Sequence, residues 1–326
     1  SNINIYYESD DYAYFQDKRA MQLYNITSIK YVNNDKLKND SKIFFKLKTP
    51  MAVTSGFYNQ YLEGIKYLYF KSYLKLTNHK NDYVEGYAEP GRDGDGKLLY
   101  GLGGDPVDGV YPTGYIILKP VLIPTFTIKS HPFTKAGLDY LKLYRPDVYY
   151  SQNFDDNAPD EMWNVLLSTF RDLGQLFSGG YYNYCKINGF CNKVIISEEY
   201  PSYIRLNTPD YIKVGGGHRV KKITYTDTWA AETIPFIYGQ TFEYKTDKGS
   251  SSGVAEYEPL TAGSEIPLRK PLWTKSEDLP YNLKSPILFL EEPLNESFYP
   301  APKIGYSRII IKNILREQDG EEINKK

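Results

Sequence analysis

The chain has 326 residues, a formal net charge of -1 at pH 7, 41% hydrophobic residues and 24% charged residues. These proportions are those of a globular protein, and the length allows a substantial core without disulfide bonds. The balanced charge provides no overall electric field to attract nucleic acid, and no apolar run is long enough for a membrane-spanning helix. We therefore expect partners, if any, to be proteins that bind local surfaces, with no nucleic acid and no membrane span.

Tyrosine is the most unusual feature of the composition, with 33 residues in the chain. Its ring is buried readily while its hydroxyl stays in water or finds a partner, so it suits half-buried pleated surfaces and interfaces. The abundance predicts a large antiparallel β structure. A surface for assembly or ligand binding is the second interpretation.

Residues 1–130 form a predicted β-rich region. Short runs of aromatic and β-branched residues at 3–7, 43–47, 67–76 and 114–119 are typical of strands. One helical candidate interrupts them near residues 59–66. The connection from 89 to 109 is rich in glycine and aspartate, which predicts a long surface loop.

Residues 131–195 form a predicted helical section, with helix expected between 134 and 182. A short helix from Thr134 to Leu143 would stop before Arg145-Pro146. A longer helix would follow, because apolar residues recur at three- and four-residue spacing between Met162 and Phe177.

Residues 196–326 are predicted to be β-rich and punctuated by proline. Strands are expected at 193–197, just before this region, and at 203–206, 219–225, 236–244, 287–290 and 306–314. The frequent prolines between 259 and 302 favour extended coil there. The predicted fold class is therefore mainly β, mixed α+β, with antiparallel strands and a short helical section.

The triple glycine Gly215, Gly216 and Gly217 precedes an alternating strand. Successive backbone N–H groups can hold an anion, but a phosphate loop needs a helix after it, and here a strand follows. We interpret the glycines as a sharp turn or a close passage of the backbone. Trp229 is expected to anchor the end of this strand by packing, and Gly253 to close a short Gly-Ser-Ser-Ser-Gly link.

Asp93 and Asp95 are the best candidates for metal ligands. Carboxylates that alternate with glycine resemble the first half of a calcium loop, because calcium prefers several oxygens from a curved segment. The far glutamate of such a loop is missing, and Arg92 and Lys97 flank the segment. A solvated turn and a calcium site both remain open, and no other cofactor is predicted.

Two cysteines occur, Cys185 and Cys191, with an Asn-Gly turn between them. A small disulfide loop could close in an oxidising compartment. Two ordinary thiols are the other interpretation.

Motifs for catalysis are missing from the sequence. There is no Gly-x-Ser-x-Gly, no His-Glu-x-x-His and no dinucleotide fingerprint, and pairs of acidic residues can be chosen anywhere among 40 acids. The sequence therefore argues against an enzyme.

Three stretches together carry a resemblance to a group of known proteins: residues 213–223, residues 250–259, and Asn295 to Pro300 with Lys303 to Ser307. They resemble blocks of very large, uncharacterised proteins of Bacteroidetes-type bacteria, in the style of RHS and toxin-shell architectures. The resemblance implies a segment of a long secreted or surface-associated protein whose strands build a shell or scaffold.

We therefore expect a non-enzymatic structural or assembly module of a larger extracellular, cell-surface or virion complex. The chain begins Ser-Asn and ends in a charged stretch, which we interpret as a fragment of a longer chain. Two alternatives remain: a carbohydrate-binding module or glycoside hydrolase that uses exposed aromatic rings, and a calcium-stabilised adhesin.

Overall fold

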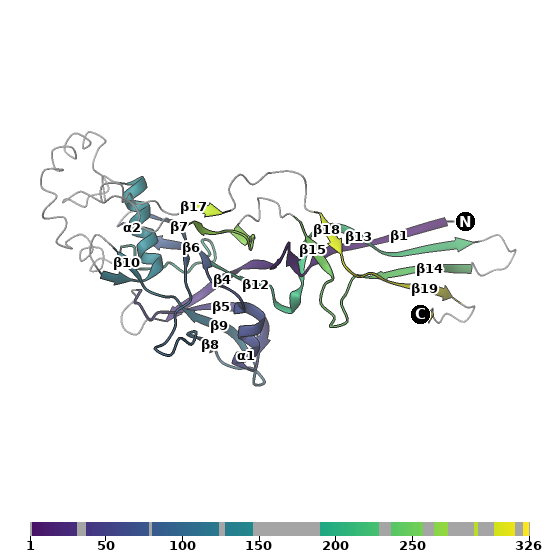
Figure 1. Cartoon of the computed structure of the whole chain (residues 1–326), viewed down its shortest axis with the longest axis horizontal. Coiled ribbons are helices and arrows are strands. Elements are labelled where there is room, and N and C mark those ends of the chain that lie inside the picture. Colours follow the sequence, from purple (N-terminus) through teal and green to yellow (C-terminus); the bar gives the residue numbers. More distant parts are fainter. Residues whose placement is uncertain are drawn as a thin grey trace, which may run out of the picture. The chain divides into compact units, whose positions relative to one another are not determined.

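A computed structural model describes most of the chain and confirms a mainly β fold with antiparallel sheets (Figure 1). The described residues are 2–30, 37–77, 80–123, 128–145, 190–227, 236–256, 264–272, 290–292, 303–316 and 322–325. The longer helix predicted from the apolar spacing between Met162 and Phe177 lies outside them. None of the described helices combines the length and the apolar character needed to cross a bilayer.

The chain divides into two compact units that do not follow the three consecutive regions expected from the sequence. Unit 1 contains residues 1–22, 207–268 and 295–326, and unit 2 contains residues 23–206 and 269–294. Unit 1 is discontinuous because the first strand pairs with a strand more than half a chain away. Each unit is described separately below.

Unit 2 is built on a seven-stranded sheet with the order β7-β6-β12-β4-β5-β9-β8. In that order the strands are β7 Asn81–Ala88, β6 Leu68–Lys75, β12 Tyr203–Asn207, β4 Met21–Lys30, β5 Lys42–Met51, β9 Tyr111–Ile117 and β8 Tyr100–Gly103. Two smaller pairs complete the unit: β10 Val121–Ile123 with β11 Ile128–Ser130, and β16 Lys270–Leu272 with β17 Leu290–Glu292. Strand β8 lies within the connection that the sequence predicted to be a loop, whereas residues 193–197 contribute only a single bridge at Val194.

The core of unit 2 is aromatic at its centre. Phe45 of β5 packs against Phe57, and Phe57 packs against Tyr61, with ring centroids 5.8 and 5.6 Å apart. Phe57 and Tyr61 come from α1 (Thr54–Phe57) and the π-helical turn η1 (Tyr58–Leu62), slightly before the position expected for a helix. All three rings are fully buried. Their tilted packing at these distances is typical of aromatic pairs in a protein core.

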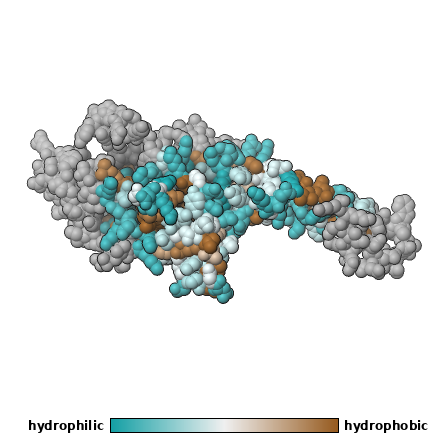
Figure 2. Space-filling model, turned by 60° about the horizontal axis from the view of Figure 1, so that its bottom comes forward, coloured by the Kyte–Doolittle hydropathy of each residue, from teal (hydrophilic) through white to brown (hydrophobic). Residues whose placement is uncertain are grey.

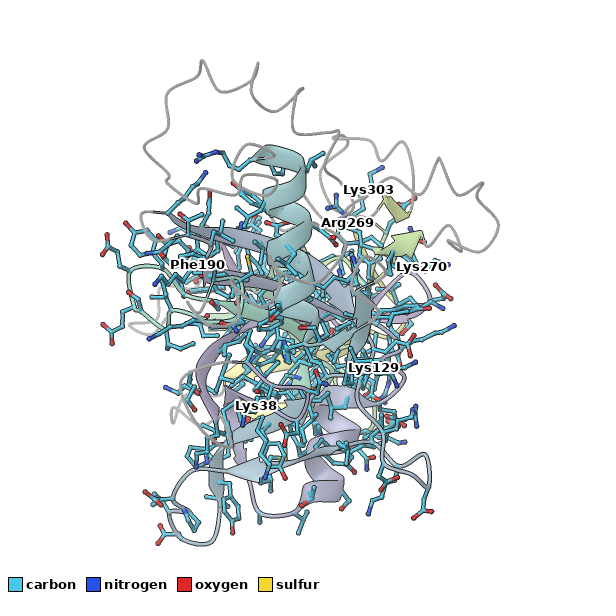
Figure 3. The ribbon with its side chains drawn as sticks, turned by 90° about the vertical axis from the view of Figure 1, so that its left-hand side faces the viewer. Lys38, Lys129, Phe190, Arg269, Lys270 and Lys303 are labelled. Carbon is cyan, nitrogen blue, oxygen red and sulfur yellow. The ribbon has the colours of Figure 1, made fainter. Side chains whose placement is uncertain are left out.

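Helix α2 (Pro132–Tyr144) confirms the short helix predicted from the sequence. Proline stands at its start, where a missing N–H costs nothing, and His131 caps it by accepting a hydrogen bond from the Phe133 amide. Figure 3 shows α2 lying in front of the strands, with Phe190 beside it. Leu138 and Leu141 are buried on the side that joins the core.

His131, the N-cap of α2, is buried, and its contribution to stability should depend on pH. Burial lowers the pKa of His131 from 6.5 to about 3. Its Nε2 atom has no hydrogen-bond partner among the described residues. The imidazole is therefore neutral in the folded protein, but it takes up a proton near pH 6.5 in the unfolded chain.

The stability that His131 contributes should be complete above pH 6.5 and should fall as the pH drops toward the folded pKa of about 3. The slope should steepen as the pH falls below 6.5 and approach about 1.4 kcal/mol of unfolding free energy per pH unit near pH 5. Urea titrations at pH 7, 6 and 5 would measure it. The matched variant His131→Asn keeps a capping oxygen and cannot titrate, so it should lose stability less steeply than the parent. Equal slopes for parent and variant would contradict the assignment.

Unit 1 contains a five-stranded sheet with the order β1-β13-β14-β19-β20. These strands are β1 Asn2–Tyr12, β13 Lys213–Asp227, β14 Phe236–Glu243, β19 Ile310–Arg316 and β20 Glu322–Lys325. Unit 1 also contains a four-stranded sheet with the order β18-β15-β2-β3. Its strands are β18 Ile304–Tyr306, β15 Gly253–Ala255, β2 Tyr14–Phe15 and β3 Lys18–Arg19. A small buried cluster, which includes Tyr12, Phe15 and Ala255, holds the second sheet together.

Candidate functional site

The triple glycine forms a close backbone passage inside β13, as the sequence predicted, although the strand begins before the glycines. Between the pairs Ser9–His218 and Asp11–Val214 the register shifts, so β13 bulges against β1. Gly216 has a φ of +106°, which L side chains rarely adopt. A Cβ atom at Gly216 would lie 2.2 Å from Cδ1 of Ile304 in β18. The neighbours Gly215 and Gly217 also have positive φ.

Gly253 lies in a buried strand and not in a flexible link, which corrects the interpretation of the serine-rich segment. A Cβ atom there would lie 2.3 Å from the Asp11 carbonyl oxygen. The hydroxyl of Ser251 donates to the same carbonyl, and that of Ser252 donates to the Arg308 carbonyl. Both serines are buried. Their hydroxyls can be buried because each has a hydrogen-bond partner, as buried polar groups in proteins usually do.

Arg219 follows the glycines and is the centre of a buried ionic cluster that sequence analysis missed. Its side chain is 8% exposed. Nε donates to Oε1 of Glu8 over 2.9 Å, and the two Nη atoms donate to the two carboxylate oxygens of Asp11 over 3.0 and 2.8 Å. We call Arg219, Glu8, Asp10, Asp11 and Tyr306 the Arg219 cluster.

Tyr306 extends the Arg219 cluster to β18. Its hydroxyl accepts a hydrogen bond from Arg219 Nη1 at 3.0 Å and donates to Oδ1 of Asp10 at 2.7 Å. The guanidinium also lies 4.4 Å from the ring centroid of Tyr244 and 5.1 Å from that of Tyr306, within the range of cation–π attraction. The cluster thus joins β1, β13 and β18.

The Arg219 cluster has the electrostatics of a structural site. Burial by itself lowers the pKa of Arg219, but hydrogen bonds to Asp11, Tyr306 and Glu8 raise it above its ordinary value. Burial, together with the hydrogen bond to Asp10, raises the pKa of Tyr306. The guanidinium therefore stays charged and the phenol stays neutral at physiological pH. Neither can act as a general base or as an ionised nucleophile there, because both roles need a pKa near the working pH.

The loop with Asp93 and Asp95 is an exposed turn at the tip of an irregular hairpin. Oδ1 of Asp93 accepts the backbone N–H groups of Asp95 and Lys97 over 3.1 and 2.8 Å. Arg92 donates to the Gly96 carbonyl over 2.7 Å. Asp93 thus shapes the turn in the way that aspartate often does. Across the described ranges, no group of three or more His, Cys, Asp or Glu side chains is arranged to hold a metal ion. Calcium binding stays a prediction.

Cys191 is fully buried in unit 2 against α2. A Cβ atom at Gly137 would lie 2.9 Å from that of Cys191, so the glycine lets the helix approach the cysteine closely. The sulfur lies 3.9 Å from the Leu76 carbonyl oxygen. Cys185 lies outside the described residues, and the predicted disulfide therefore stays a prediction. Trp229 also lies outside them, just past the end of β13 at Asp227.

The five-stranded sheet of unit 1 exposes an apolar face. Strand alternation and register place Ile3 and Ile5 beside Tyr225 and Ile223. The same face continues across β14 and β19, where the hydrogen-bonded pair Gln240 and Asn313 lies between Tyr238 and Ile311. We call this the apolar face. The exposed fractions of its large side chains are 63% for Ile3, 47% for Ile5, 60% for Tyr7, 41% for Tyr238 and 54% for Ile311. Figure 2 shows brown apolar atoms gathered over this sheet.

No protein-family model, curated protein or solved structure matches this chain. The resemblance of its C-terminal part to large Bacteroidetes-type surface proteins therefore remains a prediction.

Proposed function

We propose that the protein is a non-enzymatic structural module that assembles with other protein chains in a larger extracellular, cell-surface or virion complex. The observation that carries the proposal is the apolar face, where isoleucine and tyrosine side chains from β1, β14 and β19 are exposed together. Soluble monomers rarely expose contiguous apolar patches larger than a few hundred Å², and larger ones commonly mark interfaces.

The hydrogen-bond network inside unit 1 also supports an assembly role. The Arg219 cluster ties β1 to β13 and β18 with five charge-assisted or phenolic hydrogen bonds, described above, and the glycine passage lets the two sheets meet closely. A fixed backbone reduces the conformational entropy that is lost when a surface binds a partner. The buried polar groups of unit 1 therefore serve the shape of the sheet.

A carbohydrate-binding module is the less favoured reading because tyrosine rings in both units stack on one another. Tyr225 and Tyr238 are stacked with ring centroids 5.1 Å apart, and Tyr73 and Tyr200 with centroids 4.7 Å apart. One face of each ring is thus already covered. An aromatic platform for sugars needs an accessible ring face, together with polar groups that converge on the ligand.

Incorporation of a charged variant into the native complex would test the proposal. Ile311→Lys places a charge on the β19 part of the apolar face, and we expect incorporation to fall at least tenfold, because a buried unpaired charge is costly at an interface. Size fractionation of native extracts, followed by quantification of the chain in the high-mass fractions, measures it.

Val107→Lys is the matched control, because Val107 is 66% exposed and lies in unit 2. Its incorporation should equal that of the parent chain. The proposal is wrong if the parent chain migrates at its own mass in native extracts, or if Ile311→Lys is incorporated as well as Val107→Lys.

A further inference from the structure

We infer that strand β1 pairs edge to edge with β1 of a second copy of this chain, in antiparallel register centred on Ile5. The inference rests on the proposed assembly function and names one of its partners. The surface concerned is the side of β1 that faces away from β13. Among the described strands, β1 pairs within its sheet with β13 alone, so the outward N–H and C=O groups of residues 2–7 form an open edge. We call this the β1 edge.

The two ends of the five-stranded sheet are protected to different degrees. Native proteins guard open edges with short strands, charges, proline or bulges, because an unprotected edge pairs with other chains. Strand β20, at one end, has four residues and carries Glu322 and Lys325. Strand β1, at the other end, has 11 residues, and its segment Asn-Ile-Asn-Ile-Tyr-Tyr contains no charge and no proline. The bulges in this pair lie on β13.

Self-pairing is favoured by the order of side chains along the β1 edge. In an antiparallel pair of identical strands centred on Ile5, Ile5 faces Ile5 of the second copy and Ile3 faces Tyr7. All three lie on the same side of the strand as the apolar face. This register brings every apolar residue of that side opposite another apolar residue, and such cross-strand pairs stabilise sheets.

Charge does not oppose the pairing. The acidic residues Glu8, Asp10 and Asp11 lie at the far end of β1. Glu8 and Asp11 form ion pairs with Arg219, and Asp10 accepts a hydrogen bond from Tyr306. In the register centred on Ile5, Glu8 faces Asn2, which is neutral. The two-fold axis would pass through the middle of the pair, which gives the closed symmetry that most homodimers have. The two apolar faces would then form one continuous surface.

Cysteine cross-linking tests both the pairing and its register. In a Cys185→Ser background, Ile5→Cys should form a covalent dimer on mild oxidation, because opposed Cα atoms lie about 4.5–5.5 Å apart, within disulfide reach. Ile3→Cys is the matched control. Its counterpart in the second copy would be offset by four residues, or about 13 Å along the strand, which is beyond the limit of about 7 Å. Equal cross-linking of both variants, or none for Ile5→Cys, would overturn the inference.

Sedimentation of the purified chain separates edge pairing from stacking through the apolar face. The wild-type chain should dimerise reversibly with concentration, since pairing of six residues buries less than the roughly 1,600 Å² of a standard interface. Ile5→Lys should raise the dissociation constant at least tenfold, whereas Ile311→Lys should leave it unchanged. Circular dichroism checks that both variants are folded.

Loss of the dimer in Ile311→Lys would overturn edge pairing in favour of face stacking. A monomeric wild-type chain at all concentrations would also overturn it. Neither result bears on the proposed function, which is read from incorporation into the native complex. A normal dimer with unimpaired incorporation of Ile311→Lys would instead contradict the proposed function alone.

Discussion

Replacing Arg219 with methionine should lower the free energy of unfolding of unit 1 by about 3–5 kcal/mol, the range expected when one partner of a buried ionic network is removed. Methionine retains much of the apolar length of the side chain and removes only the charge and the donors. Asp11 would then keep its negative charge without the ion pair to Arg219, and Glu8 would keep only its longer pair with Lys221, at 3.9 Å. The Tyr306 hydroxyl would lose the donor that Arg219 supplies. Urea titration, with hydrogen–deuterium exchange of β1 and β13 to locate the loss, measures the effect.

Two companion variants make the Arg219 prediction specific. Arg308→Met is the matched control, because Arg308 pairs with Asp247 at an exposed site, where such pairs contribute at most about 1 kcal/mol. Asp11→Asn in the Arg219→Met background should recover part of the loss, since it removes one of the stranded charges. If Arg219→Met costs no more than Arg308→Met, the cluster does not hold unit 1 together.

The sequence could not have revealed the Arg219 cluster. Its acids lie in the first strand, its cation in the middle of the chain and its phenol near the end. Each looks alone like an ordinary surface residue in a chain with 40 acidic residues. The one available signal was an arginine in the strand predicted at 219–225 and an acidic run just after the strand predicted at 3–7. Without the pairing register of β1 and β13, that signal does not select a partner.

Local features were predictable because their causes are local. Helix α2 was predicted as a short helix from Thr134 to Leu143 that stops before Arg145-Pro146, and many strands were predicted from aromatic and β-branched runs. The serine-rich segment was misread for the opposite reason. Ser251 and Ser252 are buried by partners in β1 and near β19, so short-range composition suggested a link where tertiary hydrogen bonds make a buried strand.

The glycine passage was predicted from the sequence only in part. Three consecutive glycines before a strand indicated that the backbone is crowded or unusually folded there. What crowds it, Ile304 of β18 and the side chain of Asp10, comes from opposite ends of the chain. The sequence therefore predicted the existence of a tight passage and not its partners. A test of the passage should therefore separate the backbone conformation of the glycines from their contact with Ile304.

Gly216→Val should destabilise unit 1 by about 2–6 kcal/mol, through two separate causes. A β-branched residue at a φ of +106° is strained, at a cost of about 1–3 kcal/mol. Its Cβ atom would also meet Cδ1 of Ile304 at 2.2 Å, and overpacking of this kind costs about another 1–3 kcal/mol. Urea titration measures the total, and exchange of the β13 amides locates it.

The two causes can be separated within the same chain. Gly249→Val imposes a similar strain, at a φ of +81°, where nothing lies within 4 Å of a new Cβ atom, so it should show the backbone cost alone. Ile304→Ala combined with Gly216→Val removes the steric conflict, so in a double-mutant cycle the pair should cost less than the sum of the single changes. Additive costs would mean that Ile304 rotates away freely and that the passage is set by backbone conformation. A Gly216→Val variant as stable as the parent would mean that β13 can pass β18 without glycine.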